Sequence, residues 1–535
     1  MTLPFALLDW IVVGAYILVL IAGGMIFTPR KTQDARDYFL ASGQVPPWLA
    51  AISVLSATQS AATFLGGPDY GYRGDYTYLS GNIGGLMGAI FVARVLIPRF
   101  YALGATTVYE LLDGRFGRPA MRAAGGMFLI GRVLAGGARV YLAAIAISMV
   151  MFSNISPQGI FLASAGVLFA SFAFTFVGGL KSILWNDLIQ FLIYVGAALA
   201  ILLFLWSSIP ASTGEILHAL ASTPEGSNKL RLINFSTDLS EPFSILAIMT
   251  GVFLLYIANS GLDQDTTQRL LACKDARDGA RGLYISVLAT IPVIWIFISI
   301  GLLLYIFYER PDLMQRGTMA GGAPSFKGEE ITVFMRYILT ELPAGLRGLV
   351  TIGVIAAAVA TTNSALNAMS SVLVQDFYRP WRATRGPVDE RHFVQAGRVG
   401  MGLMGLAMFA MAVLSFYWQR YSSMPLLEFA LAVMTFAYAG LLGVYFTALF
   451  TKRGSSRSVY AALIAGFVTI FMLQPYIAGF VGLPAGLRGL SFPWQLCIGT
   501  AISTLVCLAG SPVKAAGTHE TPAAPALPHA AAVAD

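Results

Sequence analysis

Residues 50–72 read AAISVLSATQSAATFLGGPDYGY, an apolar stretch that polar side chains interrupt. Four hydrogen-bonding residues stand together in its middle: Ser56, Thr58, Gln59 and Ser60. Three helix breakers follow them: Gly66, Gly67 and Pro68. Unwound backbone is tolerated at membrane depth only where it faces protein or a water-filled cavity. We therefore interpret the stretch as a discontinuous membrane helix that lines a cavity, the alternative being an ordinary helix-packing face of small residues.

A second apolar stretch is interrupted in a comparable way, because residues 256–267 read YIANSGLDQDTT. Interrupted helices at corresponding places in two halves of a chain are the best sequence pointer to the binding site of a transporter. The two stretches lie five predicted spans apart. We therefore expect two five-helix repeats, one at about 48–207 and one at about 242–450.

The composition places both stretches in a membrane protein. Of the 535 residues, 57% are apolar and only 11% are charged, whereas soluble domains carry roughly 25% charged residues. The apolar runs are long and unbroken, which favours helices over a membrane barrel. They lie at 6–27, 48–67, 80–98, 123–152, 158–177, 183–207, 242–262, 283–307, 348–373, 397–417, 427–450, 458–480 and 493–509. We predict an all-α polytopic protein of thirteen spans, with a single transmembrane domain at 1–510 and a disordered cytoplasmic tail at 511–535.

Basic residues gather in alternate loops between these runs. The loops at 28–47, 99–122, 263–282, 374–396 and 451–457 hold most of them, including Arg269, Lys274, Arg277 and Arg281. Because cytoplasmic loops of membrane proteins are enriched in Lys and Arg, we predict an outside N-terminus and a cytoplasmic C-terminus in the cell (inner) membrane. An odd number of spans agrees with ends on opposite sides.

Several function classes lack their usual residues. The sequence contains no Walker A loop, and its three cysteines and four histidines form no metal-ligand, disulfide or catalytic pattern. We expect no enzyme, no organic cofactor, no nucleic-acid partner and no obligatory protein partner; the partners are a small-molecule solute and the lipid bilayer. A channel is disfavoured because no repeated filter motif is present. A transporter-like solute sensor is disfavoured because the tail is too short to fold as a signalling module.

Oxygen-bearing side chains recur in the run at 348–373. Thr361, Ser364 and Asn367 are spaced every three residues, and hydroxyl and carbonyl oxygens are the ligands of hard cations such as sodium. The alternative is that they hydrogen-bond to their own helix. Asp187, near the start of another run, is placed to balance the charge of a cation or to be solvated at a helix end.

Two arginines lie inside the run at 123–152. Arg132 and Arg139 are seven residues apart, which puts them on nearly the same helix face and about 10 Å apart along its axis. A charged residue inside a membrane is costly and usually functional, and a guanidinium matches the shape of a carboxylate. We predict that either or both contact the solute, the alternative being a structural role.

Several motifs, in order, resemble the sodium:solute symporter (sodium/glucose cotransporter) family across residues 5–510. They are DYFLASGQVPPW, SATQSAATFLGGPDYGY, TTVYELLDGRFG, GGLKSILWNDLIQ, DQDTTQRLLACKD, ATTNSALNAMSS and GLLGVYFTALFTKR. The resemblance implies a LeuT-type inverted-repeat fold and a sodium-coupled symporter. FLGGPDYGYRG is more similar to the branch with iodide, monocarboxylate and multivitamin carriers, which implies import of a small organic anion by alternating access. A sodium- or proton-coupled sugar or amino-acid symporter remains the alternative.

The resemblance also implies site residues. The sodium site consists of carbonyls from Ser56, Gln59 and Ala357 and of side chains at Ala360 and Thr361, with Asp187 beside them. Ala360 replaces a hydroxyl residue of the family pattern, which leaves open whether sodium or a proton is coupled. The solute contacts implied, besides Arg132 from the argument above, are Thr63, Arg139, Tyr256, Asn259, Gln264 and Glu428.

Overall fold

The computed structural model describes residues 5–27, 34–152, 154–315, 325–326, 329–330, 332–422 and 426–511. All but the first residue of the predicted tail, 511–535, lie outside this part of the chain. The tail therefore stays a prediction, as do the domain boundaries.

Helices dominate the first half of the chain. Their bounds are α1 (Leu7–Phe27), α2 (Ala35–Leu40), η1 (Ala41–Gly43), α3 (Pro47–Thr58), α4 (Ala61–Arg73), α5 (Thr77–Phe91), η2 (Val92–Leu96), α6 (Ile97–Leu103), α7 (Glu110–Phe116), α8 (Arg118–Phe152), α9 (Pro157–Ser207) and α10 (Thr213–Ala221). Here α marks α-helices, and η marks 3₁₀- or π-helical segments.

Helices also dominate the second half of the chain. Its elements are α11 (Ile245–Ala247), η3 (Ile248–Val252), α12 (Phe253–Ile257), η4 (Ala258–Leu262), α13 (Gln264–Leu271), α14 (Ala276–Glu309), α15 (Pro311–Met314), β1 (Ser325–Phe326), β2 (Glu329–Glu330), α16 (Val333–Thr340), α17 (Leu346–Val372), η5 (Leu373–Tyr378), α18 (Arg379–Ala383), α19 (Glu390–Ser422), α20 (Leu426–Phe450), α21 (Ser456–Met472), α22 (Pro475–Val481), α23 (Ala485–Arg488) and α24 (Phe492–Leu508). The two short strands pair antiparallel.

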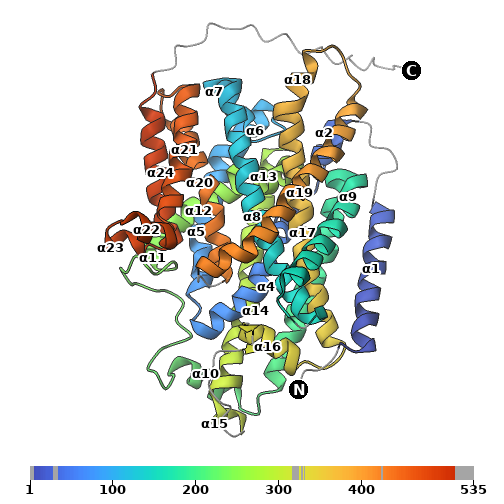
Figure 1. The fold of residues 1–535 in the computed structure, drawn as a ribbon, viewed down its shortest axis with the longest axis vertical. Coiled ribbons are helices and arrows are strands. Elements are labelled where there is room, and N and C mark those ends of the chain that lie inside the picture. The colour runs from blue at the N-terminus through green and yellow to red at the C-terminus, as the bar shows by residue number, and fades with distance from the viewer. Residues whose placement is uncertain are drawn as a thin grey trace, which may run out of the picture.

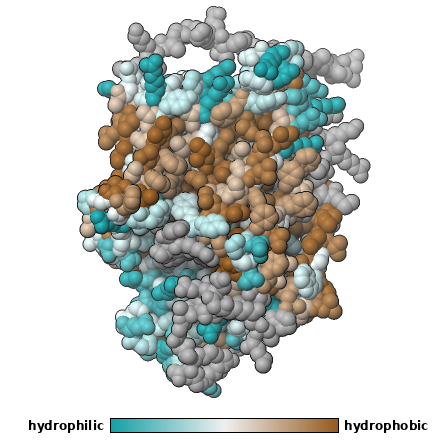
Figure 2. Space-filling model, viewed as in Figure 1, coloured by the Kyte–Doolittle hydropathy of each residue, from teal (hydrophilic) through white to brown (hydrophobic). Residues whose placement is uncertain are grey.

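Many of these helices are suited to a bilayer. Among the described residues, eight are long and apolar enough to cross a membrane, or up to ten if each of two bent pairs is one span. Three shorter apolar helices add to these, within α1, the first part of α9 and α24. The chain is a multi-pass membrane protein, and the count of thirteen stays a prediction. In Figure 2 a hydrophobic band crosses the middle of the molecule below a hydrophilic cap.

In Figure 1 the helices form one bundle, and short helices lie at each of its two ends. One end carries α2, α6, α7 and α18, and we call it the basic end because the arginine-rich segments predicted to be cytoplasmic lie there. The opposite end carries α10, α15 and α16. α1 is anchored near that opposite end, where Asp9 accepts hydrogen bonds from Gly345 N and Gly348 N and pairs with Arg347 at 2.9 Å. α24 finishes at the basic end, where Arg453 Nε donates to the Leu508 carbonyl.

The predicted discontinuous helix is confirmed, with its break at the polar cluster. α3 and α4 meet at a 68° bend. Gln59 is extended (φ −78°, ψ 120°), and Ser60 caps α4 by accepting from Ala62 N at 3.2 Å. The amide of Thr63 donates to Ser60 O at 2.9 Å, so the Gln59 carbonyl loses its usual partner. Pro68 lies inside α4 and does not end it.

The second predicted interruption is also present. Two π-helical segments, η3 and η4, precede a break at Asp263 (φ −86°, ψ 117°). The Asp263 side chain accepts from Asp265 N at 3.0 Å and thereby caps α13. Both interrupted helices are thus capped by their own polar residues, Ser60 and Asp263.

Two predicted spans, 158–177 and 183–207, form one element whose backbone turns in the middle. α9 has 51 residues, far more than the roughly 20 that span a bilayer. Gly179 has φ 60° and ψ −157°, which separates the two halves. A Cβ at Gly179 would lie only 2.5 Å from the Tyr38 carbonyl, so only glycine fits this turn against α2.

Glycines bring α4 and α14 into backbone contact. A Cβ on Gly71 would collide with the carbonyl of Ile298, and a Cβ on Gly301 would collide with that of Pro68. The two helices therefore pack without side chains between their backbones at this point. The contact holds α4, one wall of the cavity described next, against the 34-residue helix α14.

Candidate solute and cation sites

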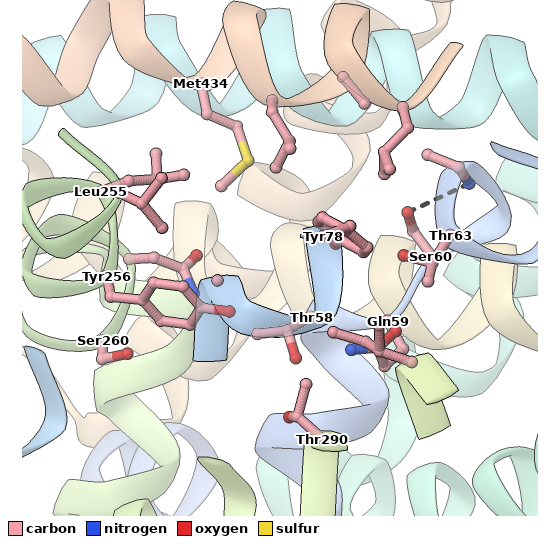
Figure 3. A pocket seen from close by; sticks show the side chains of 18 of the residues that line it. Thr58, Gln59, Ser60, Thr63, Tyr78, Leu255, Tyr256, Ser260, Thr290 and Met434 are labelled. Atoms are coloured by element: carbon pink, nitrogen blue, oxygen red, sulfur yellow. Dashed lines mark hydrogen bonds between the residues drawn. The ribbon is translucent and has the colours of Figure 1, made fainter. Parts of the chain in front are cut away.

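A cavity of about 110 Å³ lies at the two helix breaks. Residues from α3, α4, α5, α8, α12, η4, α14 and α20 line it, and they include Thr63, Arg139, Tyr256 and Asn259 among the predicted solute contacts. Figure 3 shows Tyr256, Met434 and Leu255 on one side of this space and Gln59, Ser60 and Thr63 on the other. The breaks thus expose polar groups to a space inside the bundle, as the sequence predicted for a binding site.

Hydrogen bonds join several elements on the side of the helix breaks that faces the basic end. Val45 N donates to Ala272 O at 3.0 Å and so joins the segment before α3 to the end of α13. Gln264 binds the segment before α7, since its Oε1 accepts from Val108 N and its Nε2 donates to Thr106 O, both at 2.9 Å. Tyr445 of α20 donates to Val108 O at 2.8 Å. These bonds join the segment before α3, α13, the segment before α7 and α20 into one layer.

Arg139 lines the cavity without a described carboxylate at ion-pair distance. Its Nη2 lies 3.1 Å from the Met434 sulfur, which is a weak acceptor. Arg139 forms no ion pair with any carboxylate in the described part of the chain. A partly buried guanidinium without an anion is costly unless a ligand supplies one.

Arg132, two turns away, pairs with two carboxylates. Its Nη1 lies 3.2 Å from Asp263 Oδ2, and its Nη2 contacts Asp265. Tyr438 donates to the same Asp263 oxygen at 2.6 Å. Arg132 is 5% exposed and lines a small separate cavity of about 10 Å³. The structure therefore places Arg132 between two helices as a link, away from the larger cavity that Arg139 enters.

The buried network continues through Arg269 to Asp187. Arg269 Nη1 lies 2.9 Å from Asp265 Oδ1, and its Nη2 lies 3.3 Å from Asp187 Oδ2. Arg269 also donates to Ser53 at 2.7 Å and to Ser364. Its side chain is 1% exposed and lies on α13, so the expectation that Arg269 belongs to a basic loop is wrong. Helix α13 carries it into the protein, where three carboxylates share two guanidinium groups.

Two further predicted contacts lie elsewhere. Gln264 holds the segment before α7, and neither it nor Glu428 is among the residues that line the cavity. Glu428 is in the first turn of α20. Its neighbour Leu427 does line the cavity, so Glu428 is placed beside the wall.

The residues of the predicted sodium site come from helices that pack together, α3 and α17. Ser56 is 5% exposed, Ala357 3%, Ala360 0% and Thr361 4%. Thr361 Oγ1 donates to Ala357 O at 3.0 Å and to Ala358 O at 3.1 Å, the bonding within its own helix that we gave as the alternative. A hydroxyl that donates in this way keeps lone pairs for a cation. Gln59 Oε1 is buried without a hydrogen-bond partner in the described chain, so the donor chemistry fits a hard cation.

Ser364 and Asn367 are used differently from Thr361. Ser364 accepts from Arg269, and Asn367 Oδ1 accepts from Gln268 Nε2 at 3.0 Å. The three-residue spacing on α17 thus places Thr361 at the predicted sodium site, and Ser364 and Asn367 against side chains of α13. Sequence reasoning missed Asp265 and Arg269 as network members, although their four-residue spacing is that of an ion pair on one helix face.

Comparisons with known proteins agree with this geometry. A family model described as the sodium:solute symporter family matches residues 38–466. The sodium/sialic acid symporter NanT of Aliivibrio fischeri is 26% identical over 483 residues, which cover 88% of each chain. The human sodium-coupled monocarboxylate transporter 2 is 26% identical over 383 residues, covering 70% of this chain and 58% of that protein. A solved structure of a Na⁺-coupled sialic acid symporter in a substrate-bound outward-open state covers 95% of this chain and 99% of its own, with a TM-score of 0.75 at 22% identity.

Proposed function

The chain belongs to the sodium:solute symporter family, and we propose that it imports a small organic anion whose carboxylate binds Arg139. It is a sodium-coupled transporter with a LeuT-type fold, not an enzyme. The observation that carries the proposal is the guanidinium of Arg139 in the cavity, which has a thioether and no described carboxylate beside it. A carboxylated solute supplies the missing charge, and its two oxygens match the guanidinium fork.

The rest of the cavity favours a carboxylate that also carries hydroxyl or amide groups. Thr58, Thr63, Asn259 and Thr290 line the same space as Arg139, and their hydroxyl and amide groups form specific bonds with such a solute. Thr58 and Thr290 already donate to carbonyls of their own helices at 3.0 and 2.9 Å. A solute without hydrogen-bonding groups therefore desolvates the Thr63 hydroxyl and the Asn259 Nδ2 without pairing them, which lowers its affinity. We place Gln264 and Arg132 outside the contact set, because each is engaged by other parts of the protein.

Sodium binds between α3 and α17 in this proposal. The carbonyls of Ser56, Gln59 and Ala357 and the hydroxyl of Thr361 supply its ligands, and Ala360 supplies no side-chain oxygen. A cation at this position bridges the helix break to α17 and stabilises the arrangement that holds the cavity open. The solute then binds, the layer at the basic end opens, and both are released in an alternating-access cycle. We propose that the basic end faces the cytoplasm of a cell inner membrane.

The charge of the solute decides how the membrane potential acts. One sodium ion moving inward across 100 mV contributes about 2.3 kcal/mol, enough to concentrate a neutral solute roughly fiftyfold. A monoanion carried with one sodium ion moves no net charge, so the potential then contributes nothing. Current during uptake therefore reports whether more than one sodium ion accompanies the anion.

A solute screen tests the proposal. Purified protein in detergent is heated with sodium or choline and with sugars, amino acids, monocarboxylates or carboxylated sugars, and solutes that stabilise it only with sodium are then tested for uptake in proteoliposomes. We expect the hits to be carboxylates and Arg139→Gln to raise their KM by about 10–100-fold, the value of a charge-assisted hydrogen bond. The K0.5 for sodium should change little. Uncharged hits with an unchanged KM in Arg139→Gln would contradict the anion assignment.

A further inference from the structure

A second concave surface lies between η5, α18 and α19 near the basic end. It is a groove of about 600 Å³, separate from the solute cavity. Phe377, Tyr378 and Trp381 form one wall, and Ala396, Val399 and Leu403 form the other. Trp381 is 46% exposed, Val399 63% and Leu403 54%, so the groove opens outward from the bundle. It is apolar along its length and aromatic where it meets the basic end.

The aromatic end is held in a fixed shape. The Tyr378 hydroxyl lies 2.8 Å from His392 Nε2, and the two rings stack 5.7 Å apart. This contact joins the two walls. Arg379 pairs with Glu390 and lies 4.8 Å above the Phe393 ring. The groove is therefore a shaped surface rather than a gap between mobile side chains.

Positive charge surrounds this end of the groove. Residues 379–398 contain five arginines, Arg379, Arg382, Arg385, Arg391 and Arg398, against two acids, Asp389 and Glu390. Of these arginines, only Arg379 forms an ion pair with a described carboxylate. The remaining charge is uncompensated within the described protein.

Two of the arginines are neighbours of Trp381 in the groove wall. The Arg385 guanidinium stacks 4.0 Å from the centre of the Trp381 ring, which forms the groove wall. Arg382 follows Trp381 in α18, and its Nη1 is buried without a hydrogen-bond partner in the described chain. A buried guanidinium N–H without an acceptor is unfavourable, and a phosphate oxygen is a strong acceptor for it.

We propose that this groove binds one anionic phospholipid. The acyl chain lies along the apolar walls, and the phosphate is held by Arg382 and Arg385. Charge complementarity selects the occupant, because a zwitterionic lipid brings a cationic group to the same arginines. Basic pockets beside membrane helices are suited to anionic headgroups for this reason. Free phosphate lacks the chain that the groove accommodates.

Native mass spectrometry of the purified full chain tests this proposal. Delipidated protein is mixed with phosphatidylglycerol or phosphatidylcholine of the same chain length, and inorganic phosphate serves as the headgroup-free probe. We expect one phosphatidylglycerol to be retained more strongly than phosphatidylcholine, and phosphate alone to be retained weakly. The double variant Arg382→Gln/Arg385→Gln should lower phosphatidylglycerol affinity about thirtyfold, since each basic residue at the surface contributes about fivefold.

Two further variants separate the groove from general charge. Arg277→Gln/Arg457→Gln removes the same charge from exposed positions elsewhere and should leave lipid retention unchanged. Val399→Trp keeps every charge, fills the groove from an exposed position and should lower retention. Equal retention of the two lipids, equal loss in the Arg277/Arg457 control, full retention in Val399→Trp, or equally strong retention of phosphate would each overturn the proposal.

Discussion

Arg132 and Arg139 are two arginines on one face of one helix, and their surroundings differ completely. Arg132 lies between two carboxylates of the interrupted second-half helix, Asp263 and Asp265. Arg139 reaches a cavity and meets only the sulfur of Met434. The first charge is balanced by the protein and holds helices together. The second has no carboxylate partner in the described protein and is available to a ligand. The two arginines therefore differ in function because their partners differ.

The largest expected effect comes from removing the paired arginine. Arg132→Met leaves Asp263 and Asp265 with fewer cations, and breaking a buried pair costs about 3–5 kcal/mol. We expect a large fall in the unfolding temperature in detergent. Arg139→Met is the matched control and should be close to the unchanged protein, because no described carboxylate loses a partner.

Equal unfolding temperatures for the two methionine variants would contradict the conclusion that Arg132, unlike Arg139, stabilises the fold. If Arg132→Met gives no folded protein, Asp263→Asn removes one acceptor with little change in shape. Its fall in unfolding temperature should then exceed that of Arg139→Met. The same order in both experiments would identify the pairing, rather than the arginine side chain, as the source of stability.

An intermediate effect is expected when position 139 keeps a positive charge but no longer carries a planar guanidinium. Arg139→Lys retains a cation but replaces the planar fork by a single ammonium. We expect the KM for a carboxylate solute to rise about tenfold, the value of roughly one hydrogen bond, measured by sodium-driven uptake in proteoliposomes. An unchanged KM would show that only the charge matters.

The smallest effect concerns sodium and tests whether the two bound species can be separated. Thr361→Ala removes one oxygen ligand and should raise the sodium K0.5 of uptake about fivefold, since one neutral interaction contributes about 1 kcal/mol. Solute KM at saturating sodium should remain the same. Ala360→Ser, which restores a hydroxyl at the neighbouring position, should shift K0.5 the other way. Sodium dependence unaffected by either change would remove Thr361 from the proposed site.

The sequence predicted features that depend on neighbours along the chain. Both helix interruptions follow from local composition, since an amide and hydroxyls replace the apolar residues that a continuous span needs. The position of the first break was less predictable. Gly66, Gly67 and Pro68 look like the breakers, yet they lie inside α4, where the glycines permit contact with α14 and Leu427 rather than a turn.

Roles that depend on distant partners could not be read from the sequence. Arg132 and Arg139 have similar local sequences, and what distinguishes them is Asp263, 131 residues along the chain from Arg132. Gln264 is the first residue of α13, directly after its cap Asp263, and its amide binds Val108, 156 residues away along the chain. Arg269 looks like a loop charge until the fold surrounds it with Asp265 and Asp187.

The glycine contact between α4 and α14 has a mechanical consequence. Where two backbones touch, neither helix can slide past the other without a collision, so the pair behaves as one rigid lever. α14 has 34 residues and is therefore about 50 Å long, from the opposite end to the basic end. When α4 tilts slightly at the Gln59–Ser60 hinge, α14 therefore tilts with it. The displacement at the far end of α14 is larger because that helix is long.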